Sequence, residues 1–125
     1  MARTLTLTFM SGSRDGEVLQ IEAAGSPPSI SIGREAPCEL VITDDPDLSR
    51  RHARISWSGS AWMLEDLGSS NGTFLGEFQA AQRLTKPTAI KDGQIFRVGL
   101  TRLRLGSVKD DRVATASAAA NATRN

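Results

Sequence analysis

Hydrophobic and polar residues alternate over most of the chain. In the stretch TLTLTF (residues 4–9), Leu5, Leu7 and Phe9 alternate with threonines, a pattern typical of a strand with one buried face. Further short runs, some with the same two-residue period, are bounded by Gly, Pro, Asp and Ser, at residues 17–22, 29–33, 39–42, 52–57, 61–66, 73–76, 94–99 and 101–106. No long helical period occurs before residue 107. The pattern predicts an all-β fold, an antiparallel β-sandwich.

The C-terminal end has a different composition. Residues 107–125 are rich in Ala, Ser, Thr and Asn and carry almost no bulky apolar side chain after Val113. Such a segment buries too little apolar surface to offset the entropy lost on ordering it. We therefore expect a folded domain over residues 1–106 and a flexible tail, or the start of a linker, over residues 107–125.

Composition excludes several classes of protein. The 125 residues are enough for one core, and a formal net charge of +1 lacks the positive excess of strongly basic nucleic-acid-binding domains. Cys38 is the only cysteine, so the chain can form neither an internal disulfide nor a Cys/His zinc site, and no cofactor is expected. No apolar run approaches the ~18 residues of a membrane span, and the alternating N-terminus lacks a signal-peptide core. These features predict a cytoplasmic protein.

Two polar motifs carry the candidate chemistry: LSRRH at residues 48–52 and GSSNG at residues 68–72. One interpretation is catalytic, with Ser49 as nucleophile, His52 as base and Asp66 as the third member of a triad. No G-x-S-x-G nucleophile elbow, P-loop or G-x-G-x-x-G motif accompanies these residues. The sequence therefore disfavours an enzyme.

A second interpretation is nucleic-acid binding through Arg50, Arg51 and Arg54. The acidic stretch DDPD (residues 44–47) directly precedes these arginines and would repel a polyanion. Trp57 and Trp62 occupy strand positions that suit the core better than base stacking. Nucleic acid is accordingly not an expected partner, and neither is a membrane.

The third interpretation is a cradle for one compact anion. Arg34 follows Gly33 at the end of a predicted strand, and Ser49 and the Ser70-Asn71 pair lie in two later loops. A guanidinium binds phosphate bidentately, while a hydroxyl and loop N–H groups add further hydrogen bonds. This combination suits a phosphorylated side chain held between loops at one end of a sandwich.

Four blocks of the sequence resemble the forkhead-associated (FHA) domain in their order and spacing. The blocks are SIGRE (31–35), LSRRHARI (48–55), WMLEDLGSSNGTFLG (62–76) and IKDGQIFRVG (90–99), and the resemblance covers about residues 4–106. It implies a β-sandwich of about eleven strands that binds phosphothreonine peptides through loops at one end and is not an enzyme.

The resemblance also assigns roles to individual residues. Arg34 matches the arginine that holds the phosphate, and Ser49 matches the serine that bonds it. Arg50 matches a position that often adds a phosphate contact, and Ser70 a position that lies against the phosphothreonine. Asn71 matches the asparagine that bonds the backbone of the bound peptide.

Other matched positions shape the site or its specificity. Gly33 and His52 match shaping positions, with His52 as a buried strut between loops, and Gly72 occupies a tight turn that favours positive φ. Asp47 lies in the loop that helps select the third residue after the phosphothreonine; this acid, with Asp44 and Asp45 nearby, favours a basic or polar residue there. The sequence departs from the family at residues 75–77, where Leu-Gly-Glu replaces a common Asn-Gly turn.

The sequence thus predicts a module that recruits phosphothreonine-containing partners marked by a Ser/Thr kinase. An alternative is a phosphate-independent interaction module on the same fold. A third hypothesis concerns Thr115 and Thr123 in the tail: if a kinase modified either one, the tail, at high local concentration, would occupy and block the Arg34 site of its own or a neighbouring chain.

Overall fold

The computed structural model of the protein describes residues 3–76 and 81–106, and all regular elements within these ranges are β-strands. This confirms the predicted all-β class and the count of about eleven strands. The strands are β1 (Arg3–Phe9), β2 (Val18–Ala23), β3 (Ser29–Gly33), β4 (Leu40–Val41), β5 (Ala53–Trp57), β6 (Trp62–Asp66), β7 (Thr73–Leu75), β8 (Gln82–Arg83), β9 (Thr88–Ile90), β10 (Ile95–Val98) and β11 (Thr101–Leu105).

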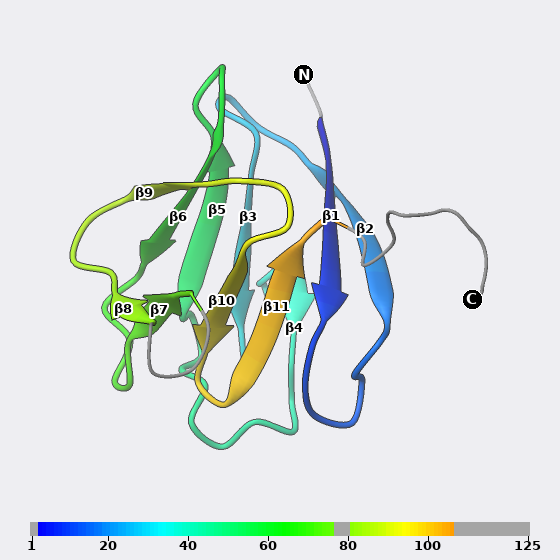
Figure 1. Ribbon diagram of the computed structural model, residues 1–125, viewed down its shortest axis with the longest axis vertical. Coiled ribbons are helices and arrows are strands. Elements are labelled where there is room, and N and C mark those ends of the chain that lie inside the picture. The colour runs from blue at the N-terminus through cyan, green and yellow to red at the C-terminus, as the bar shows by residue number, and fades with distance from the viewer. Residues whose placement is uncertain (1–2, 77–80, 107–125) are drawn as a thin grey trace.

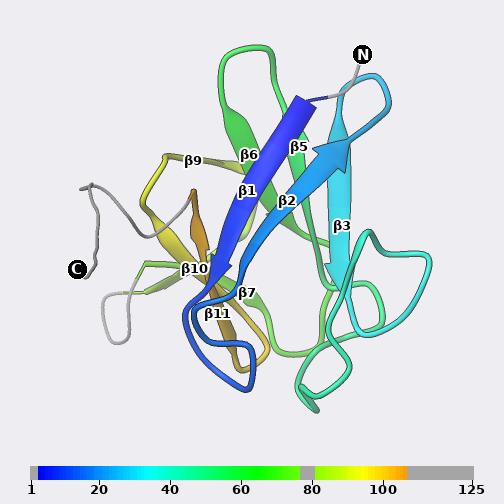
Figure 2. The same ribbon diagram turned by 90° about the vertical axis from the view of Figure 1, so that its right-hand side faces the viewer.

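The strands form two facing sheets (Figure 1, Figure 2). One sheet has six strands in the order β2-β1-β11-β10-β7-β8, and the other has five in the order β4-β3-β5-β6-β9. Every pairing is antiparallel except that of β3 with β4, which is parallel. The chain leaves β3 through a loop over residues 34–39 and returns beside it in the same direction. This crossover places Gly33 opposite Val41 at the end of the sheet.

The predicted alternation sets the core between the sheets. Leu5, Leu7 and Phe9 are at most 1% exposed, and Leu103 and Leu105 are paired with Phe9 and Leu7 on the neighbouring strand. The five-stranded sheet contributes further buried side chains to the same cluster, among them Ile30, Ile32, Ile55 and Leu64. Full burial of such a side chain stabilises the fold by about 1.5–3 kcal/mol.

Some expectations differ from the structure. The short strands β8 and β9 were not predicted, because no hydrophobic run marks Gln82–Arg83 or Thr88–Ile90 in the sequence. The tryptophans were expected in the core, but Trp57 is only half-buried and Trp62 packs at the edge of the core cluster. Their rings instead meet edge to face, with centroids 5.2 Å apart, and the Arg3 guanidinium lies 4.0 Å from the centroid of Trp57.

Residues 77–80 and 107–125 lie outside the described part of the chain, and the expectations that concern Glu77, the tail and its threonines fall there. The boundary of the folded domain at residue 106 therefore stays a prediction. Among the residues that the structure describes, no helix has the length and apolar character needed to cross a membrane.

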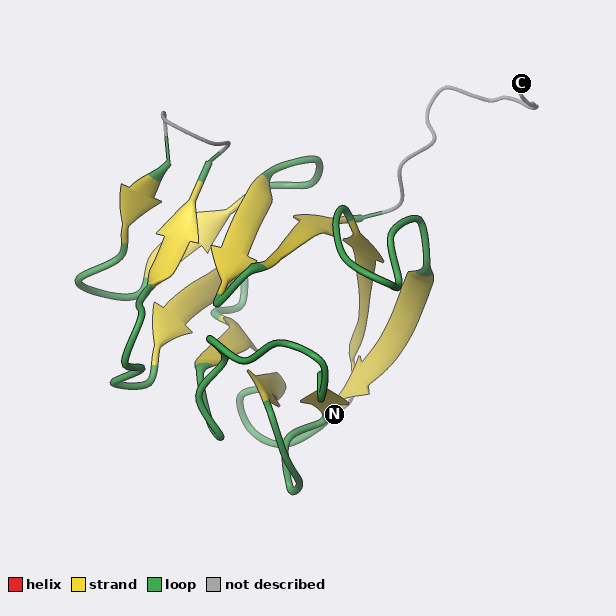
Figure 3. Ribbon diagram, turned by 90° about the horizontal axis from the view of Figure 1, so that it is seen from below, coloured by secondary structure: helices red, strands yellow, loops and turns green. Residues whose placement is uncertain are grey.

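Five loops gather at one end of the sandwich, the lower end in Figure 1 and the end facing the viewer in Figure 3. β1, β3 and β10 run toward this end, and the loop that follows each of them begins there. The loops comprise residues 10–17, 34–39, 42–52, 67–72 and 99–100. All of the sequence-predicted site residues lie in or next to these loops.

Candidate functional site

An open depression with a volume of about 410 Å³ lies between three of these loops. It is lined by Arg34, Pro46, Asp47, Leu48, Ser49, Arg50, Arg51, Ser70 and Asn71. The structure therefore brings together residues that lie up to 37 positions apart in the sequence, from Arg34 to Asn71. The lining includes every predicted contact residue and, in addition, Arg51, which the sequence interpretation left outside the site.

The end of β3 fixes the position of Arg34. Its backbone N–H donates to the carbonyl oxygens of both Ser49 (3.0 Å) and Arg50 (3.1 Å), which ties the end of the strand to the β4–β5 loop. The preceding residue must be glycine for this approach. A Cβ at Gly33 would overlap the carbonyl oxygen of Arg50 and lie 2.7 Å from Sγ of Cys38. Gly33 thus lets the two backbones approach closely enough to place Arg34 beside Ser49.

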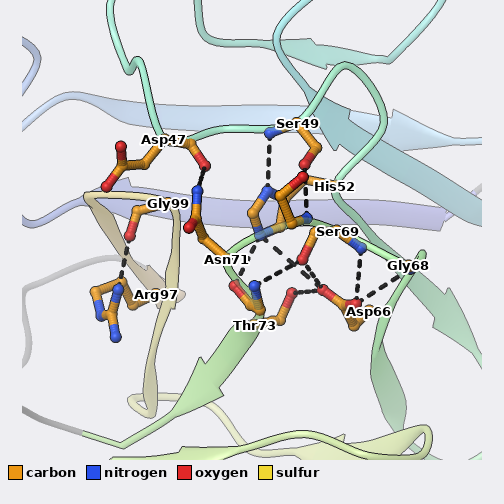
Figure 4. Close-up of polar contacts among 12 residues, drawn as sticks. Asp47, Ser49, His52, Asp66, Gly68, Ser69, Asn71, Thr73, Arg97 and Gly99 are labelled. Atoms are coloured by element: carbon orange, nitrogen blue, oxygen red, sulfur yellow. Dashed lines mark hydrogen bonds and ion pairs between the residues drawn. The ribbon is translucent and has the colours of Figure 1, made fainter.

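Ser49 makes two hydrogen bonds that orient it. Its backbone N–H donates to Nδ1 of His52 (3.1 Å), and its Oγ accepts from the backbone N–H of Ser70 (3.1 Å) (Figure 4). A hydroxyl that accepts one bond retains its own proton to donate elsewhere. The Ser49 hydroxyl can therefore donate to an anion in the depression.

His52 links the β4–β5 loop to the β6–β7 loop on the buried side of the depression. It is fully buried, and its Nε2 lies 2.8 Å from the carbonyl oxygen of Gly72. A carbonyl only accepts, so Nε2 carries the proton and Nδ1, which accepts from Ser49, does not. Neither ring nitrogen bonds the Ser49 hydroxyl, and Oδ1 of Asp66 is 4.0 Å from Nε2. The serine–histidine hydrogen bond that a catalytic triad requires is not formed.

Asp66 holds the β6–β7 loop through four hydrogen bonds. Its Oδ1 accepts from the hydroxyls of Ser69 (2.5 Å) and Thr73 (2.7 Å), and its Oδ2 accepts from the N–H groups of Gly68 (3.1 Å) and Ser69 (3.0 Å). The Ser69 hydroxyl in turn accepts from the N–H of Gly72 (2.8 Å). Burial alone would raise the pKa of Asp66, but the hydrogen bonds from Ser69 and Thr73 outweigh it and hold this pKa below its ordinary value.

We expect Asp66→Asn to destabilise the protein in a pH-dependent way. Because the folded state lowers the pKa of Asp66, its contribution is present above the unfolded pKa of about 4 and is lost as the pH falls through the folded value. The variant should lose on the order of 1–2 kcal/mol of unfolding free energy at pH 7, since charge-assisted bonds become weaker ones. Urea unfolding at pH 7 and at about pH 3 measures this, and the difference from wild type should shrink at the lower pH.

The exposed Asp15 supplies the matched control for this substitution, because its carboxylate accepts no hydrogen bond within the described ranges. Asp15→Asn should change the unfolding free energy by less than about 0.5 kcal/mol at either pH. If Asp66→Asn lost the same unfolding free energy at both pH values, the result would contradict the role given to the charge of Asp66.

Asn71 joins the β6–β7 loop to the β4–β5 loop at the surface. Its Nδ2 donates to the carbonyl oxygen of Asp47 (2.8 Å) (Figure 4), while its Oδ1 has no hydrogen-bond partner among the described residues. Gly72, the next residue, has a φ of 87°, the left-handed conformation expected for this turn. The turn therefore presents one fixed carboxamide with an available acceptor to the depression.

The acidic stretch before Ser49 does not act as a unit. Asp45 is 4% exposed and accepts from the N–H of Leu100 (2.8 Å) and the hydroxyl of Thr101 (2.7 Å), so it anchors the β10–β11 turn. Asp44 accepts from the hydroxyl of Ser13 (2.5 Å) in the β1–β2 loop. Of the three acids, only Asp47 lines the depression. The expectation that Asp44 and Asp45 add to its effect on a ligand is wrong for the buried Asp45.

The arginines of the motif divide between two surfaces. Arg50 lines the depression with its side chain 74% exposed, and its Nε lies 4.0 Å from Oε1 of Glu35. A contact this long and this exposed leaves the guanidinium available to a ligand. Arg54 instead pairs with Glu65 across β5 and β6 at 2.9 Å. Arg34, Arg50 and Arg51 therefore give the depression a positive character.

Comparison with known proteins identifies the family. The model of the FHA domain matches residues 30–99, more than half of the chain. The chain is a member of the FHA domain family. This confirms the resemblance drawn from the four sequence blocks, and FHA domains are interaction modules that are generally not enzymes.

Relatives and solved structures agree with this assignment. The FHA domain-containing protein FhaB of Mycobacterium tuberculosis is 42% identical over 76 residues, which cover 61% of this chain and 46% of FhaB. The chain thus spans about half the length of the curated relatives it matches first. An FHA domain solved in a study of phosphothreonine-dependent FHA interactions superposes with a TM-score of 0.63 at 29% identity, over 82% of this chain and 95% of that one. The FhaA FHA domain, solved as a complex with the intracellular domain of Rv3910, gives a TM-score of 0.62 at 29% identity, over 82% and 99%.

Proposed function

We propose that this FHA domain binds phosphothreonine in partner proteins through the depression between its loops. The observation that carries the proposal is the hydrogen bond from the Ser70 N–H to Oγ of Ser49. This bond leaves the Ser49 hydroxyl proton available to donate to a ligand in the depression, which Arg34 and Arg50 also line. The likeness at 29% identity to an FHA domain studied for phosphothreonine-dependent interactions supports the same conclusion.

Each lining residue then has a distinct task. Arg34 binds the phosphate bidentately, Ser49 donates one hydrogen bond to it, and Arg50 adds a further charged contact. Ser70 lies against the phosphothreonine, and Oδ1 of Asn71 accepts a hydrogen bond from the peptide backbone. All of these groups belong to loops that hydrogen bonds tie to one another.

Asp47 contributes to the choice of peptide in this proposal. Its backbone carbonyl is occupied by Asn71, while its exposed carboxylate lines the depression. A carboxylate in this place favours a basic or polar residue after the phosphothreonine and opposes an acidic one at the same position.

Calorimetric titration with matched peptides tests the proposal. We expect binding to a phosphothreonine peptide and no measurable binding to its unphosphorylated form, because the phosphate supplies most of the charge-assisted bonds. The phosphoserine form should bind about fourfold more weakly, as one buried methyl group contributes about 0.8 kcal/mol. Equal binding of the phosphorylated and unphosphorylated peptides would overturn the proposal and favour a phosphate-independent interaction module.

The cellular role follows from the same chemistry. A module of this kind recruits partners after a Ser/Thr kinase has marked them, which makes it a component of signal transduction. A cytoplasmic site of action belongs to the proposal, since such kinases use ATP. The match over 46% of FhaB leaves the activity of any longer protein to be established with that protein.

A further inference from the structure

The outer face of the six-stranded sheet carries a row of arginines. Arg83 on β8 is paired with Phe74 on β7, Phe74 is paired with Arg97 on β10, and Arg97 is paired with Arg102 on β11. These four residues therefore form one line across four strands, and Arg104 lies two residues further along β11 on the same face. We call Arg83, Arg97, Arg102 and Arg104, with Phe74 among them, the basic strip.

The basic strip is packed in a defined way. The Arg97 guanidinium carbon lies 4.3 Å from the centroid of the Phe74 ring, and the same guanidinium donates to the carbonyl oxygen of Gly99 (2.7 Å). Ile95, the neighbour of Arg97 on this face, is only 9% exposed although it is not part of the core cluster between the sheets. The stems of these arginines cover apolar surface, and Nε of Arg104 is itself buried there.

The charge on this face is strongly unbalanced. Among the strand residues that the structure describes there, the only carboxylate is Glu22 on the far strand β2, whereas the face carries Arg83, Arg97 and Arg104 besides Arg102, which also bonds the carbonyl oxygen of Met10. None of the ion pairs found in the described ranges involves Arg83, Arg97 or Arg104. Like charges placed directly opposite, as Arg97 and Arg102 are, destabilise a sheet.

The basic strip begins at the edge of the phosphopeptide site. A Cβ at Gly72 would lie 2.8 Å from Nε of Arg83 and 3.2 Å from Cε1 of Phe74, so both side chains contact the turn that follows Asn71. At the other side, Arg97 bonds the β10–β11 turn, which Asp45 ties to the β4–β5 loop. A peptide that leaves the depression past Asn71 would therefore pass directly onto the basic strip.

We propose that the basic strip binds an acidic segment of the same partner protein that carries the phosphothreonine. Charge complementarity argues for this occupant, since three arginines occupy aligned positions on this face and carboxylate side chains pair with arginine. Adjacent strands lie about 4.8 Å apart, so the line from Arg83 to Arg102 is about 14 Å long. An extended chain covers this length with four to five residues, at about 3.3 Å each. The expected ligand is therefore a short run of Asp and Glu, and this inference rests on the proposed phosphothreonine site.

A nucleic acid fits the basic strip less well. Single-stranded nucleic acid requires aromatic faces on which bases stack, and the face of Phe74 is covered by Arg97. Its affinity also depends on many phosphate contacts, for which a line of about 14 Å leaves little room. An acidic peptide needs only a few ion pairs, because the phosphothreonine already holds it in place.

Matched peptides and variants of the full chain test this inference. The first peptide carries one phosphothreonine with neutral flanks; the others add six glutamates or six glutamines, before or after it, through a short Gly/Ser spacer. We expect one glutamate peptide to bind about tenfold more tightly than its glutamine match at low salt, with the gain lost near 0.5 M NaCl. Arg83→Gln and Arg97→Gln should each reduce this gain, while the affinity for the first peptide stays within about twofold.

Arg54→Gln supplies the control, because it removes one positive charge from the other sheet. It should leave the glutamate gain unchanged. Arg97 contacts a turn as well as Phe74, so thermal unfolding accompanies each titration, and Arg83→Gln alone suffices if the Arg97 variant is unstable.

The outcomes separate this inference from the proposed function. Binding of the neutral phosphothreonine peptide without any glutamate gain overturns the basic strip and leaves the phosphate site standing. If the neutral phosphothreonine peptide does not bind, the phosphate site is overturned. If a six-glutamate peptide still binds in that case, and binds Arg83→Gln more weakly, the result supports the basic strip alone. A twelve-nucleotide single strand that binds through Arg83 and Arg97 more tightly than the glutamate peptide overturns the acidic-segment assignment.

Discussion

Replacing Arg34 by alanine should remove nearly all phosphothreonine-dependent binding. Arg34 lines the depression beside Ser49, and its backbone is fixed there by two hydrogen bonds. A bidentate, charge-assisted pair contributes about 1.5–3 kcal/mol per bond to a charged group, and its loss also weakens the remaining phosphate contacts. We expect a loss on the order of 2–4 kcal/mol, or roughly 30-fold to 1,000-fold in Kd, measured by calorimetric titration.

Two further variants define what Arg34 contributes. Arg34→Lys retains the charge but not the planar pair of donors, so it should recover only part of the affinity. Lys91→Ala removes one positive charge at an exposed position outside the depression and should leave the Kd within about twofold. A Kd that is unchanged in Arg34→Ala would show that the phosphate is bound by other residues.

Replacing Gly33 by alanine should destabilise the domain and disrupt its site together. The added methyl group would overlap the carbonyl oxygen of Arg50, a backbone atom that cannot move without the loop it belongs to. Overpacking of this kind costs about 1–3 kcal/mol and more where the backbone must shift. We expect a loss of about 3 kcal/mol in the unfolding free energy by urea titration, with a weaker affinity for phosphothreonine peptide because Arg34 and Ser49 separate.

Gly12 is the matched control for this substitution. It has a φ of 79° and open space around its Cα, so Gly12→Ala tests backbone strain without a steric overlap and should cost about 1 kcal/mol. Cys38→Ala combined with Gly33→Ala removes the sulfur neighbour but not the carbonyl, and should restore only a small part of the loss. Wild-type stability in Gly33→Ala would mean that the loop yields to the methyl group at no cost.

The sequence predicted the fold because its signals are local. Leu5, Leu7 and Phe9 display the strand period directly, and the structure buries all three. The strands β8 and β9 have no such signal, because their two and three residues are set by pairing with β7 and β6 rather than by their own pattern. The tryptophans show the limit of the same argument, since a period of two indicates a face of the sheet but not how far a ring lies from its edge.

The site and the supports that lie within its motifs, such as His52, were predicted, but the supports that come from outside the motifs were not. Asp45 and Asp47 look equivalent in the sequence, yet one is buried beneath a turn and the other lines the depression. The tertiary contacts of Asp45 with Leu100 and Thr101 span more than 50 residues, and no local pattern encodes them. The basic strip was missed for a similar reason: Arg83 and Arg97 become neighbours of Phe74 only through the register of three strands.

Under the proposed function, the hydrogen bonds among Ser49, His52, Ser70 and Asn71 bear on how fast the domain would bind a phosphopeptide. These bonds tie the loops of the proposed site to one another, which favours binding with little rearrangement of the backbone. Association can then proceed at the rate of a productive collision, and differences among partners appear chiefly in how long each complex lasts. The residues that flank the phosphothreonine would set the lifetime of each complex. The association rate would be the same for every newly phosphorylated partner.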